Sequence, residues 1–250
     1  MLIMYTHLAN EMDVNFDFKH KTVLVVGGSR GIGERVVKDF LDSGATVLYI
    51  SRKESLNKKL SKAKHLKCDI GVKEEIYDAF SKIEDLDFLV NVAGINFCKK
   101  IEDIEADEWD KVLAVNLRSF YLTCKLALEK MKLNNYGKII NVSSIAGRNK
   151  SIVSGIHYTA SKAGVLGLTR QLAQEAAPFG ININAVCPSQ TITDMLKQSM
   201  SEEDLEKLSS RIPLSRLATP AEQSMPILFL CSEASSYMTG CILDVNGGQL

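Results

Sequence analysis

Residues 23–33 read Val-Leu-Val-Val-Gly-Gly-Ser-Arg-Gly-Ile-Gly, the pattern of a short buried strand, a glycine-rich turn and the start of a helix. Glycines let the backbone turn tightly and approach a ligand closely, while the N–H groups and dipole of the following helix attract negative charge. The spacing is G-x-x-x-G-x-G rather than the commoner G-x-G-x-x-G. Its position at a strand-to-helix junction nevertheless predicts that this turn binds the pyrophosphate of a dinucleotide.

Around this segment, short β-branched runs alternate with helical patterns along the rest of the chain. The predicted strands are Thr22–Val26, Thr46–Ile50, His65–Cys68, Phe88–Val90, Lys138–Val142, Ile181–Val186 and Ile242–Val245. Strands separated by helices imply right-handed crossovers and a parallel sheet that is covered on both faces. The predicted fold class is therefore α/β, a single Rossmann-type, doubly wound domain with seven parallel strands.

Two segments stand apart from this alternation. Residues 1–15 are expected to form a flexible N-terminal arm ahead of a single dinucleotide-binding domain that covers residues 16–250. Residues 189–219 hold a charged amphipathic piece between prolines and follow the end of a predicted strand. Ligands of open α/β sheets bind outside the carboxyl ends of the strands, so a lid over the site is expected here. An ordinary surface helical hairpin is the alternative.

The composition argues against several classes of protein. Thirty basic residues balance thirty acidic ones, so no bulk charge draws the chain to nucleic acid or to an anionic membrane. No apolar run approaches the roughly 20 residues that span a bilayer. The six cysteines lack any C-x-x-C spacing, which favours reduced thiols over a disulfide framework or a metal site. We therefore expect a cytoplasmic protein without a bound metal.

Tyr158 and Lys162 are the strongest catalytic candidates. A spacing of four places both side chains on one face of a helix, and an ammonium beside a phenol lowers a phenol pKa that is ordinarily about 10. Such a phenol can exchange a proton near neutral pH. Ser144 follows a predicted strand and could hydrogen-bond the same substrate oxygen. The Tyr-x-x-x-Lys pairs that begin at Tyr49 and Tyr121 have no such serine before them and are interpreted as structural.

The end of the second predicted strand bears on the choice of cofactor. An acidic side chain about 20 residues after the glycine-rich turn would bind the 2′-hydroxyl of NAD. The chain has Ser51-Arg52-Lys53 there, without a carboxylate. Arg52, and Arg30 within the turn, are placed to bind a 2′-phosphate through paired hydrogen bonds. NADP(H) is therefore predicted in preference to NAD(H).

From about residue 18 to residue 248 the chain resembles the short-chain dehydrogenase/reductases of the compact, single-domain kind. The motifs that carry the resemblance are Gly27…Gly31-x-Gly33, Cys68-Asp69-Ile70, Asn91-Val-Ala-Gly94, Val-Asn116-Leu, Ser144, Tyr158-x-x-x-Lys162, Pro188-Ser-Gln-Thr-Ile-Thr193 and Asp244-Val-Asn-Gly-Gly248. The resemblance implies four catalytic residues, Asn116, Ser144, Tyr158 and Lys162. Together with the residues already discussed, the expected cofactor site consists of Gly27, Ser29, Arg30, Gly31, Ile32, Gly33, Ser51, Arg52, Asp69, Ile70, Asn91, Ala93, Gly94, Tyr158, Lys162, Pro188, Thr191 and Thr193.

The family resemblance also implies roles for these residues. Tyr158 would be the general acid that protonates a carbonyl oxygen as hydride arrives. Lys162 would hold the nicotinamide ribose hydroxyls and lower the Tyr158 pKa. Ser144 would orient and polarise the carbonyl, and Asn116 would anchor a water that relays protons to Lys162. Asp69 would meet the adenine amine.

Within this family the chain looks closest to the bacterial β-ketoacyl-carrier-protein reductases, which implies reduction of a 3-oxoacyl thioester. Carrier-protein reductases present basic side chains near the positions of Asn135 and Phe179, and both are uncharged here. One alternative is an NADP-linked sugar, polyol or other secondary-alcohol dehydrogenase. Another is a non-catalytic nucleotide-sensing module. Degraded members of such folds usually lose the tyrosine or the lysine, and this chain keeps both, which favours an enzyme.

Two further expectations concern the surroundings of the site. His157 is expected to lie behind the catalytic residues or in the substrate wall, because adjacent helical residues point about 100° apart. The helical segments 107–131 and 157–177 carry more apolar positions than one sheet face needs, which predicts a twofold contact between copies. The family resemblance implies a homotetramer, with a homodimer as the alternative.

Overall fold

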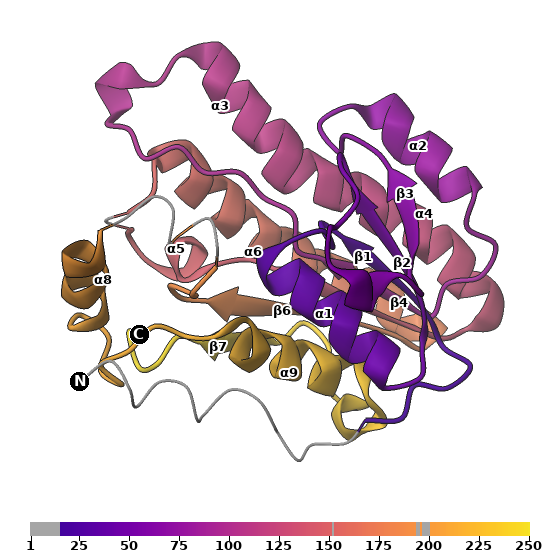
Figure 1. Ribbon diagram of the computed structural model, residues 1–250. Helices are drawn as coiled ribbons and strands as arrows, with labels where there is room; N and C mark the ends of the chain where they lie inside the picture. The colour runs from indigo at the N-terminus through magenta and orange to yellow at the C-terminus, as the bar shows by residue number, and fades with distance from the viewer. Residues whose placement is uncertain (1–15, 152, 194–195, 197–200) are drawn as a thin grey trace.

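The computed structural model describes residues 16–151, 153–193, 196 and 201–250. One parallel sheet carries seven strands in the order β3-β2-β1-β4-β5-β6-β7 (Figure 1). The strands are β1 (Thr22–Val26), β2 (Thr46–Ser51), β3 (Lys64–Lys67), β4 (Phe88–Asn91), β5 (Gly137–Val142), β6 (Ile181–Pro188) and β7 (Ile242–Val245). The predicted fold class and all seven predicted strands are confirmed, with boundaries that differ by at most two residues.

Helices connect the strands and cover both faces of the sheet (Figure 1). The α-helices are α1 (Gly31–Asp42), α2 (Lys73–Ser81), α3 (Ala106–Leu113), α4 (Ser119–Asn134), α5 (Ile145–Arg148), α6 (Ile156–Ala176), α8 (Glu202–Ser209) and α9 (Pro220–Cys231). Shorter turns are η2 (Lys58–Leu60), η3 (Ile101–Asp103), η5 (Ala177–Phe179) and η6 (Glu233–Ser235), and η4 (Ala114–Arg118) is π-helical. Helices α2, α4 and α6 cover one face, and α1 and α9 cover the other.

The two-sided packing explains the run of apolar residues in β1. Val23 and Val25 pack in the core shared with α1 and α9, whereas Leu24 and Val26 pack in the core shared with α2 and α4. All four side chains are fully buried. Successive strand residues point to opposite faces, so a strand that is covered on both faces favours consecutive apolar residues. This rigid sheet fixes where the strand ends lie.

The predicted helix over residues 107–131 is interrupted in the structure. Helix α3 passes through the π-helical turn η4 into α4. A π turn inserts an extra residue into the hydrogen-bond ladder and often occurs at functional sites. The apolar pattern continues through the turn, which is why the periodicity alone does not reveal it. Asn116 lies within the turn and is fully buried.

The apolar positions that could meet a symmetry mate divide into two groups. Five of them are buried within the chain itself: Phe120, Leu122, Met131, Val165 and Leu166. Five others stay partly exposed: Leu113, Leu117, Leu126, Leu168 and Leu172. Assembly into a dimer or tetramer would therefore rest on the five partly exposed residues, and it stays a prediction.

The predicted lid segment leaves the sheet after β6 and rejoins the domain before α9. Thr191 pairs with Ala218 in a parallel bridge, so the two ends of the segment lie side by side. Between these ends, α8 contributes to a small apolar cluster that consists of Leu208, Ile212 and Leu217 with Val153, Ile192, Leu196 and Leu205. The lid role stays a prediction. Residues 194, 195 and 197–200 of this segment, and the predicted arm at residues 1–15, lie outside the described residues.

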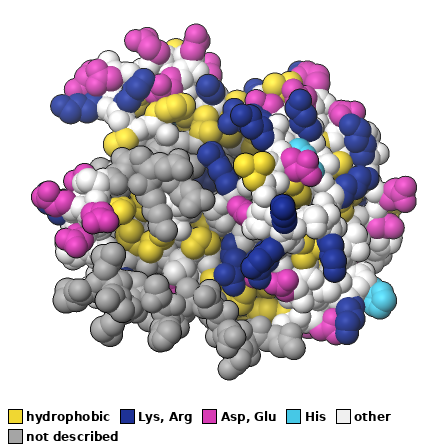
Figure 2. Space-filling view, in the orientation of Figure 1, with side chains coloured by type: hydrophobic (Ala, Val, Ile, Leu, Met, Phe, Trp, Pro, Cys, Tyr) yellow, Lys and Arg dark blue, Asp and Glu magenta, His cyan; other side chains and the backbone are white. Residues whose placement is uncertain are grey.

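The surface is mixed in character. In the space-filling view, hydrophobic side chains lie beneath the η3–α3 segment beside the grey region, and Lys and Arg side chains gather over and beside α1 (Figure 2). Among the residues described, no helix combines the length and the apolar character needed to cross a bilayer. The six cysteines are all free, and four of them are buried: Cys68, Cys124, Cys187 and Cys231.

Candidate active site

The predicted site residues gather at one edge of the sheet. Gly27 follows β1, Asp69 comes just after β3, Ala93 comes just after β4, and Ser144 comes just after β5. Because every strand is parallel to its neighbours, the carboxyl ends of the strands meet at the same edge. The strand order reverses between β1 and β4, and open α/β sheets bind their ligands at such a switch point.

The glycine-rich turn packs closely against its neighbours at this switch point. A Cβ atom on Gly27 would stand 2.8 Å from the Cα of Ala93, and Gly27 has a φ of +97°. A Cβ atom on Gly28 would stand 2.6 Å from the Cβ of Tyr49. Larger residues would displace the ends of β2 and β4. The turn therefore needs glycine for steric reasons that the structure makes explicit. The burial of Tyr49 confirms its structural interpretation.

The first turn of α1 adds positive potential to the same place. Arg30 is its N-cap in an extended conformation, and no side chain caps the turn. N–H groups at such a helix start bind phosphate well. Ser29 and Ile32 are partly buried on either side of Arg30 and Gly31. A backbone cradle of glycines beside a helix N-terminus fits the pyrophosphate of a dinucleotide.

The end of β2 presents the predicted basic groups. Arg52 directly after the strand and Arg30 in the turn are both exposed. Ser51 is firmly held, because its hydroxyl donates to the Lys53 carbonyl at 2.6 Å and lies 3.0 Å from His65 Nε2. Both guanidinium groups are therefore accessible, and their part in binding an additional phosphate stays a prediction.

One polar and one apolar residue, Asp69 and Ile70, follow the end of β3. The Asp69 carboxylate accepts a 2.9 Å hydrogen bond from the Gly71 N–H, while the Asp69 N–H donates to Glu75 at 2.7 Å. Ile70 is buried in the core on the α2 and α4 side of the sheet. Only the backbone of Ile70 can therefore face a cofactor, whereas the carboxylate of Asp69 is fixed at the sheet edge.

The predicted part of Asn91 in the cofactor site is limited to its backbone. Its side chain is fully buried, donates to Asn141 Oδ1 at 2.9 Å and accepts from Thr123 Oγ1 at 2.9 Å. Asn141 in turn donates to Thr169 at 3.1 Å. Buried polar groups must be paired, and these four pair with one another. The resulting chain ties β4 and β5 to α4 and α6.

Tyr158 and Lys162 lie one turn apart near the start of α6, as predicted. The Lys162 ammonium is buried, donates to the Val142 carbonyl at 2.8 Å, and lies 5.8 Å from the centre of the Tyr158 ring. A Cβ atom on Gly94 would stand 3.6 Å from Lys162 Nζ. The ends of β4 and β5 and the start of α6 therefore converge on the same ammonium.

Burial governs the protonation of this pair. It lowers the pKa of Lys162 to about 8. It raises the pKa of Tyr158, and a hydrogen bond with Ser144 offsets part of that rise. The predicted lowering of the Tyr158 pKa by Lys162 is therefore contradicted. The physical reason is that loss of hydration penalises the phenolate by more than the Ser144 hydrogen bond stabilises it.

Ser144 occupies the position that was predicted for it. It is partly exposed, forms the N-cap of α5 and accepts a 3.1 Å hydrogen bond from the Ala146 N–H. Its neighbour Ser143 donates to the Lys162 carbonyl at 2.8 Å. These two hydroxyls fix the end of β5 against α6, so Ser144 and Tyr158 share one hydrogen-bonded unit.

Asn116 connects three segments of the site. Its side-chain amide forms two 2.9 Å hydrogen bonds with the backbone of Ile95 and donates to Ser161 Oγ at 3.1 Å. Ser161 donates to the Tyr158 carbonyl at 2.7 Å. The side chain of Asn116 is thus fully engaged, and a water-anchoring role would need its backbone carbonyl. Ser161 was not predicted as a site residue. Its position three residues after Tyr158 on a helix was the available signal, because it places the hydroxyl within reach of the Tyr158 carbonyl.

The segment after β6 faces the glycine-rich turn. Pro188 ends β6, and Thr191 is buried three residues further on. Thr193 comes close to the turn, because a Cβ atom on Gly31 would stand 3.2 Å from Thr193 Cγ2. A cofactor on the turn would therefore pass beside Thr193, as the family resemblance implies.

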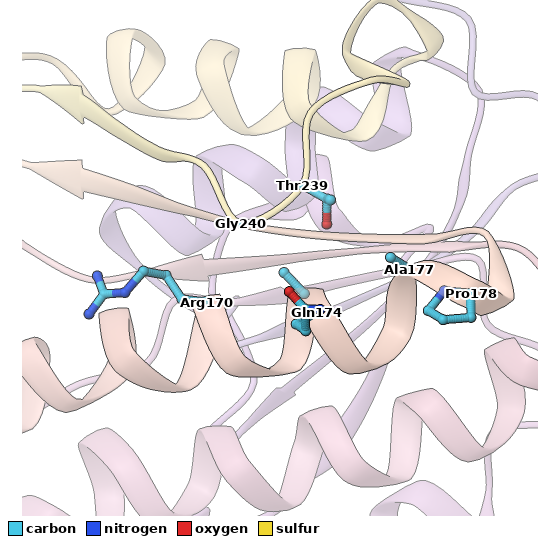
Figure 3. A pocket seen from close by; sticks show the side chains of 7 residues that line it. Arg170, Gln174, Ala177, Pro178, Thr239 and Gly240 are labelled. Atoms are coloured by element: carbon cyan, nitrogen blue, oxygen red, sulfur yellow. The ribbon is translucent and has the colours of Figure 1, made fainter.

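One cavity lies away from these residues. About 370 Å³ in volume, it is lined by the carboxyl-terminal half of α6 and the Thr239–Gly240 turn (Figure 3). Arg170 and Gln174 extend from the helix along its wall. Gln174 stands 16 residues after Tyr158, which is about 24 Å along a helix. This cavity contains none of the predicted site residues.

Comparisons with known proteins agree with this geometry. A family model described as Enoyl-(Acyl carrier protein) reductase matches residues 26–249. The 3-oxoacyl-[acyl-carrier-protein] reductase FabG of Aquifex aeolicus is 37% identical over 242 residues, covering 92% of this chain and 97% of the relative. The structure of a 3-oxoacyl-[acyl-carrier protein] reductase from Brucella melitensis has a TM-score of 0.89 at 29% identity and covers 96% of this chain and 97% of its own. The aldohexose dehydrogenase of Thermoplasma acidophilum has a TM-score of 0.87 at 29% identity, with coverage of 92% and 94%.

The chain therefore belongs to the short-chain dehydrogenase/reductases and is an oxidoreductase that acts on CH–OH and C=O groups. A similar Brucella melitensis reductase, with a TM-score of 0.86 at 29% identity and coverage of 96% and 97%, holds NAD. An ElxO variant, with a TM-score of 0.84 at 30% identity and coverage of 92% and 98%, holds NADPH. These findings support a nicotinamide cofactor, and they do not decide between NAD(H) and NADP(H).

Proposed function

We propose that this protein is a cytoplasmic NADPH-dependent reductase that converts a 3-oxoacyl thioester into the corresponding secondary alcohol. The observation that carries the proposal is the convergence of a phenol, a buried ammonium and a serine hydroxyl beside a glycine-rich turn. The relatives named as 3-oxoacyl-[acyl-carrier-protein] reductases support the substrate class. The similarity to an aldohexose dehydrogenase keeps a sugar or other secondary alcohol as the second candidate.

The proposed reaction assigns a separate task to each side chain. A reduced nicotinamide, when bound, supplies the hydride. Ser144 donates a hydrogen bond to the substrate carbonyl and holds its oxygen near Tyr158. Tyr158 transfers its phenolic proton to that oxygen as the C=O bond is reduced. Lys162 returns a proton to the tyrosinate left behind.

The two pKa shifts have different consequences for the reaction. A general acid must carry its proton at the working pH, and the raised pKa of Tyr158 keeps the phenol protonated although it makes the phenol a weaker acid. The lowered pKa of Lys162, about 8, favours release of its proton near neutral pH. Lys162 is therefore suited to return a proton to Tyr158 after transfer.

Two features support a thioester as the substrate. The apolar cluster to which α8 contributes, which includes Val153, Ile192 and Leu205, lies in and around the segment after β6, and we propose that it contacts the acyl chain. In addition, the Lys132 ammonium lies 4.3 Å above the ring of Phe179. The chain therefore has a basic group beside one of the positions where the sequence alone lacked one. Lys132 and Phe179 precede β5 and β6, so this basic group lies at the amino edge of the sheet, where we propose that it contacts an acidic carrier protein.

Substrate class is tested by following NADPH oxidation with a panel of substrates. We expect kcat/KM for 3-oxoacyl thioesters to exceed that for small ketones by at least about tenfold, because a buried acyl chain adds about 0.8 kcal/mol per CH₂. The reverse assay with NADP⁺ and aldohexoses serves as the comparison. Turnover of a sugar with no turnover of any thioester would reject the proposed substrate.

The carrier is tested separately with Lys132→Glu. We expect KM for a carrier-bound thioester to rise by roughly three- to tenfold through charge repulsion, while KM for the same acyl group on N-acetylcysteamine stays unchanged. Lys62→Glu is the control, since Lys62, beyond η2, is also exposed. Equal effects on both forms of the substrate, or equal effects of both variants, would remove Lys132 from the carrier surface.

The cofactor preference follows from the two arginines. We expect NADPH to bind at least about tenfold more tightly than NADH, because a charge-assisted hydrogen bond contributes about 1.5–3 kcal/mol. Arg52→Asp should weaken NADPH binding by about tenfold or more and leave NADH binding unchanged or improved. Fluorescence titration of both cofactors measures this, with Lys53→Asp as a control for bulk charge. Equal affinities of the wild-type protein for the two cofactors would contradict the assignment.

A further inference from the structure

His157 lies directly before the catalytic tyrosine and is fully buried in the described structure. Both of its ring nitrogens are engaged. Nδ1 accepts a 2.8 Å hydrogen bond from the Tyr158 N–H, and Nε2 lies 3.3 Å from Glu108 Oε1. Because the backbone N–H can only donate, the ring proton resides on Nε2 and points to Glu108. His157 therefore lies behind the catalytic residues and not in the substrate wall.

Glu108 is itself anchored. Its second carboxylate oxygen accepts a 2.6 Å hydrogen bond from Lys99, and this contact lowers the pKa of Glu108. Lys99 belongs to the loop that follows β4. In the same loop, Phe97 packs edge-on against the imidazole, with 6.2 Å between ring centres, and its carbonyl accepts from the Gly155 N–H at 3.1 Å. The β4 loop and the first turns of α3 and α6 therefore meet at the imidazole.

Two side chains hydrogen-bond the backbone of Tyr158, one at its N–H and one at its carbonyl. His157 accepts its N–H, and Ser161 donates to its carbonyl at 2.7 Å. Ser161 is held in turn by the amide of Asn116. The Ser161 side of this arrangement involves a predicted catalytic residue. The His157 side involves residues without any assigned role.

We propose that the chain Lys99–Glu108–His157 is a positioning device that fixes the first turn of α6 and thereby aims the phenol of Tyr158 at the substrate oxygen. The inference rests on the proposed role of Tyr158 as general acid. His157 touches neither substrate nor cofactor and acts through Tyr158. A displacement of about 1 Å in a reacting group can lower a rate about 10²-fold, so a device of this kind has a measurable effect.

Two substitutions separate the functions of the imidazole. His157→Asn keeps an acceptor at the position of Nδ1 and removes the donor to Glu108. His157→Gln keeps a donor at the position of Nε2. We expect kcat to fall by about 10- to 100-fold in His157→Asn and by less than about fivefold in His157→Gln. Glu108→Ala should match His157→Asn, and the double variant should lose no more activity than either single variant, because the two residues act as one unit.

Three readouts distinguish positioning from a purely structural role. In His157→Asn, the Kd for NADPH measured by fluorescence should stay within about twofold of wild type. The KM for substrate should change less than kcat. The primary isotope effect on kcat with NADPH deuterated at the transferred position should increase, because hydride transfer becomes more rate-limiting. A lower melting temperature with unchanged kcat and unchanged isotope effect would overturn the inference.

A Tyr158→Phe variant separates this inference from the proposed function. An inactive Tyr158→Phe beside a fully active His157→Asn would overturn the positioning role alone. An active Tyr158→Phe would instead overturn the proposed function. Loss of activity in Tyr158→Phe and in His157→Asn, with rescue in His157→Gln, supports both.

Discussion

Replacing Tyr158 with Phe should lower kcat for ketone reduction by about 10²- to 10⁴-fold, because general acid catalysis contributes a factor of that size. The substitution removes a single hydroxyl from a partly buried ring and should leave the fold intact. The Kd for NADPH should stay within a few-fold of wild type. Steady-state kinetics at saturating NADPH and fluorescence titration of the cofactor measure the two quantities on the same preparations.

Tyr121→Phe is the matched control for this variant. Tyr121 begins another Tyr-x-x-x-Lys pair, but it is an exposed residue of α4 and has no serine-bearing strand end before it. Tyr121→Phe should therefore keep the wild-type kcat. Wild-type turnover by Tyr158→Phe would show that another group supplies the proton.

Lys162→Met should remove activity and at the same time stabilise the fold at neutral pH. Burial lowers the pKa of Lys162 from 10.5 to about 8, so the charged ammonium costs the folded chain stability at pH 7. Its removal should raise the free energy of unfolding by about 1–3 kcal/mol, after the loss of its hydrogen bond to the Val142 carbonyl is taken into account. Denaturant unfolding at pH 7 measures this difference.

The gain in stability should disappear as the pH rises. Below about pH 8 the lysine is charged in both the folded and the unfolded wild-type chain. Between about pH 8 and pH 10.5 the unfolded chain binds more protons than the folded chain, so wild-type stability rises with pH relative to the variant. A stability difference that is independent of pH, or a loss of stability at pH 7, would contradict the account.

Lys138→Met provides the control for Lys162→Met. Lys138 is also fully buried, and burial also lowers its pKa, but its ammonium donates to the Ser232 carbonyl at the opposite edge of the sheet. Activity should therefore survive in Lys138→Met. Loss of activity in both variants would point to general damage of the fold.

The sheet was predictable because its physical signal is local. Strands that are covered on both faces favour consecutive apolar residues, such as residues 23–26 of β1, and such runs are visible in the sequence. The positions of Gly27, Ser144 and Tyr158 at one edge followed from the parallel order of these strands. The topology of the sheet and the place of the site were therefore predicted correctly.

Three features were not predictable from the same pattern. The π-helical turn at Asn116 leaves the apolar periodicity undisturbed, so its sequence looks like that of an ordinary helix. The inward orientation of Asn91 depends on its partners Asn141 and Thr123, which lie 50 and 32 residues away. The rise in the Tyr158 pKa depends on how far the folded chain removes the phenol from water. Each of these is a consequence of tertiary contacts.

We expect the site beside the glycine-rich turn to transfer hydride to a ketone while Tyr158 supplies the proton. A single-turnover reaction of a 3-oxoacyl thioester with deuterated NADPH tests it most directly, with the product analysed by mass spectrometry. The account predicts one deuterium on the carbinol carbon of the 3-hydroxyacyl product in wild type and almost no product in Tyr158→Phe over the same time. Equal product in both proteins, or a product without deuterium at that carbon, would contradict it.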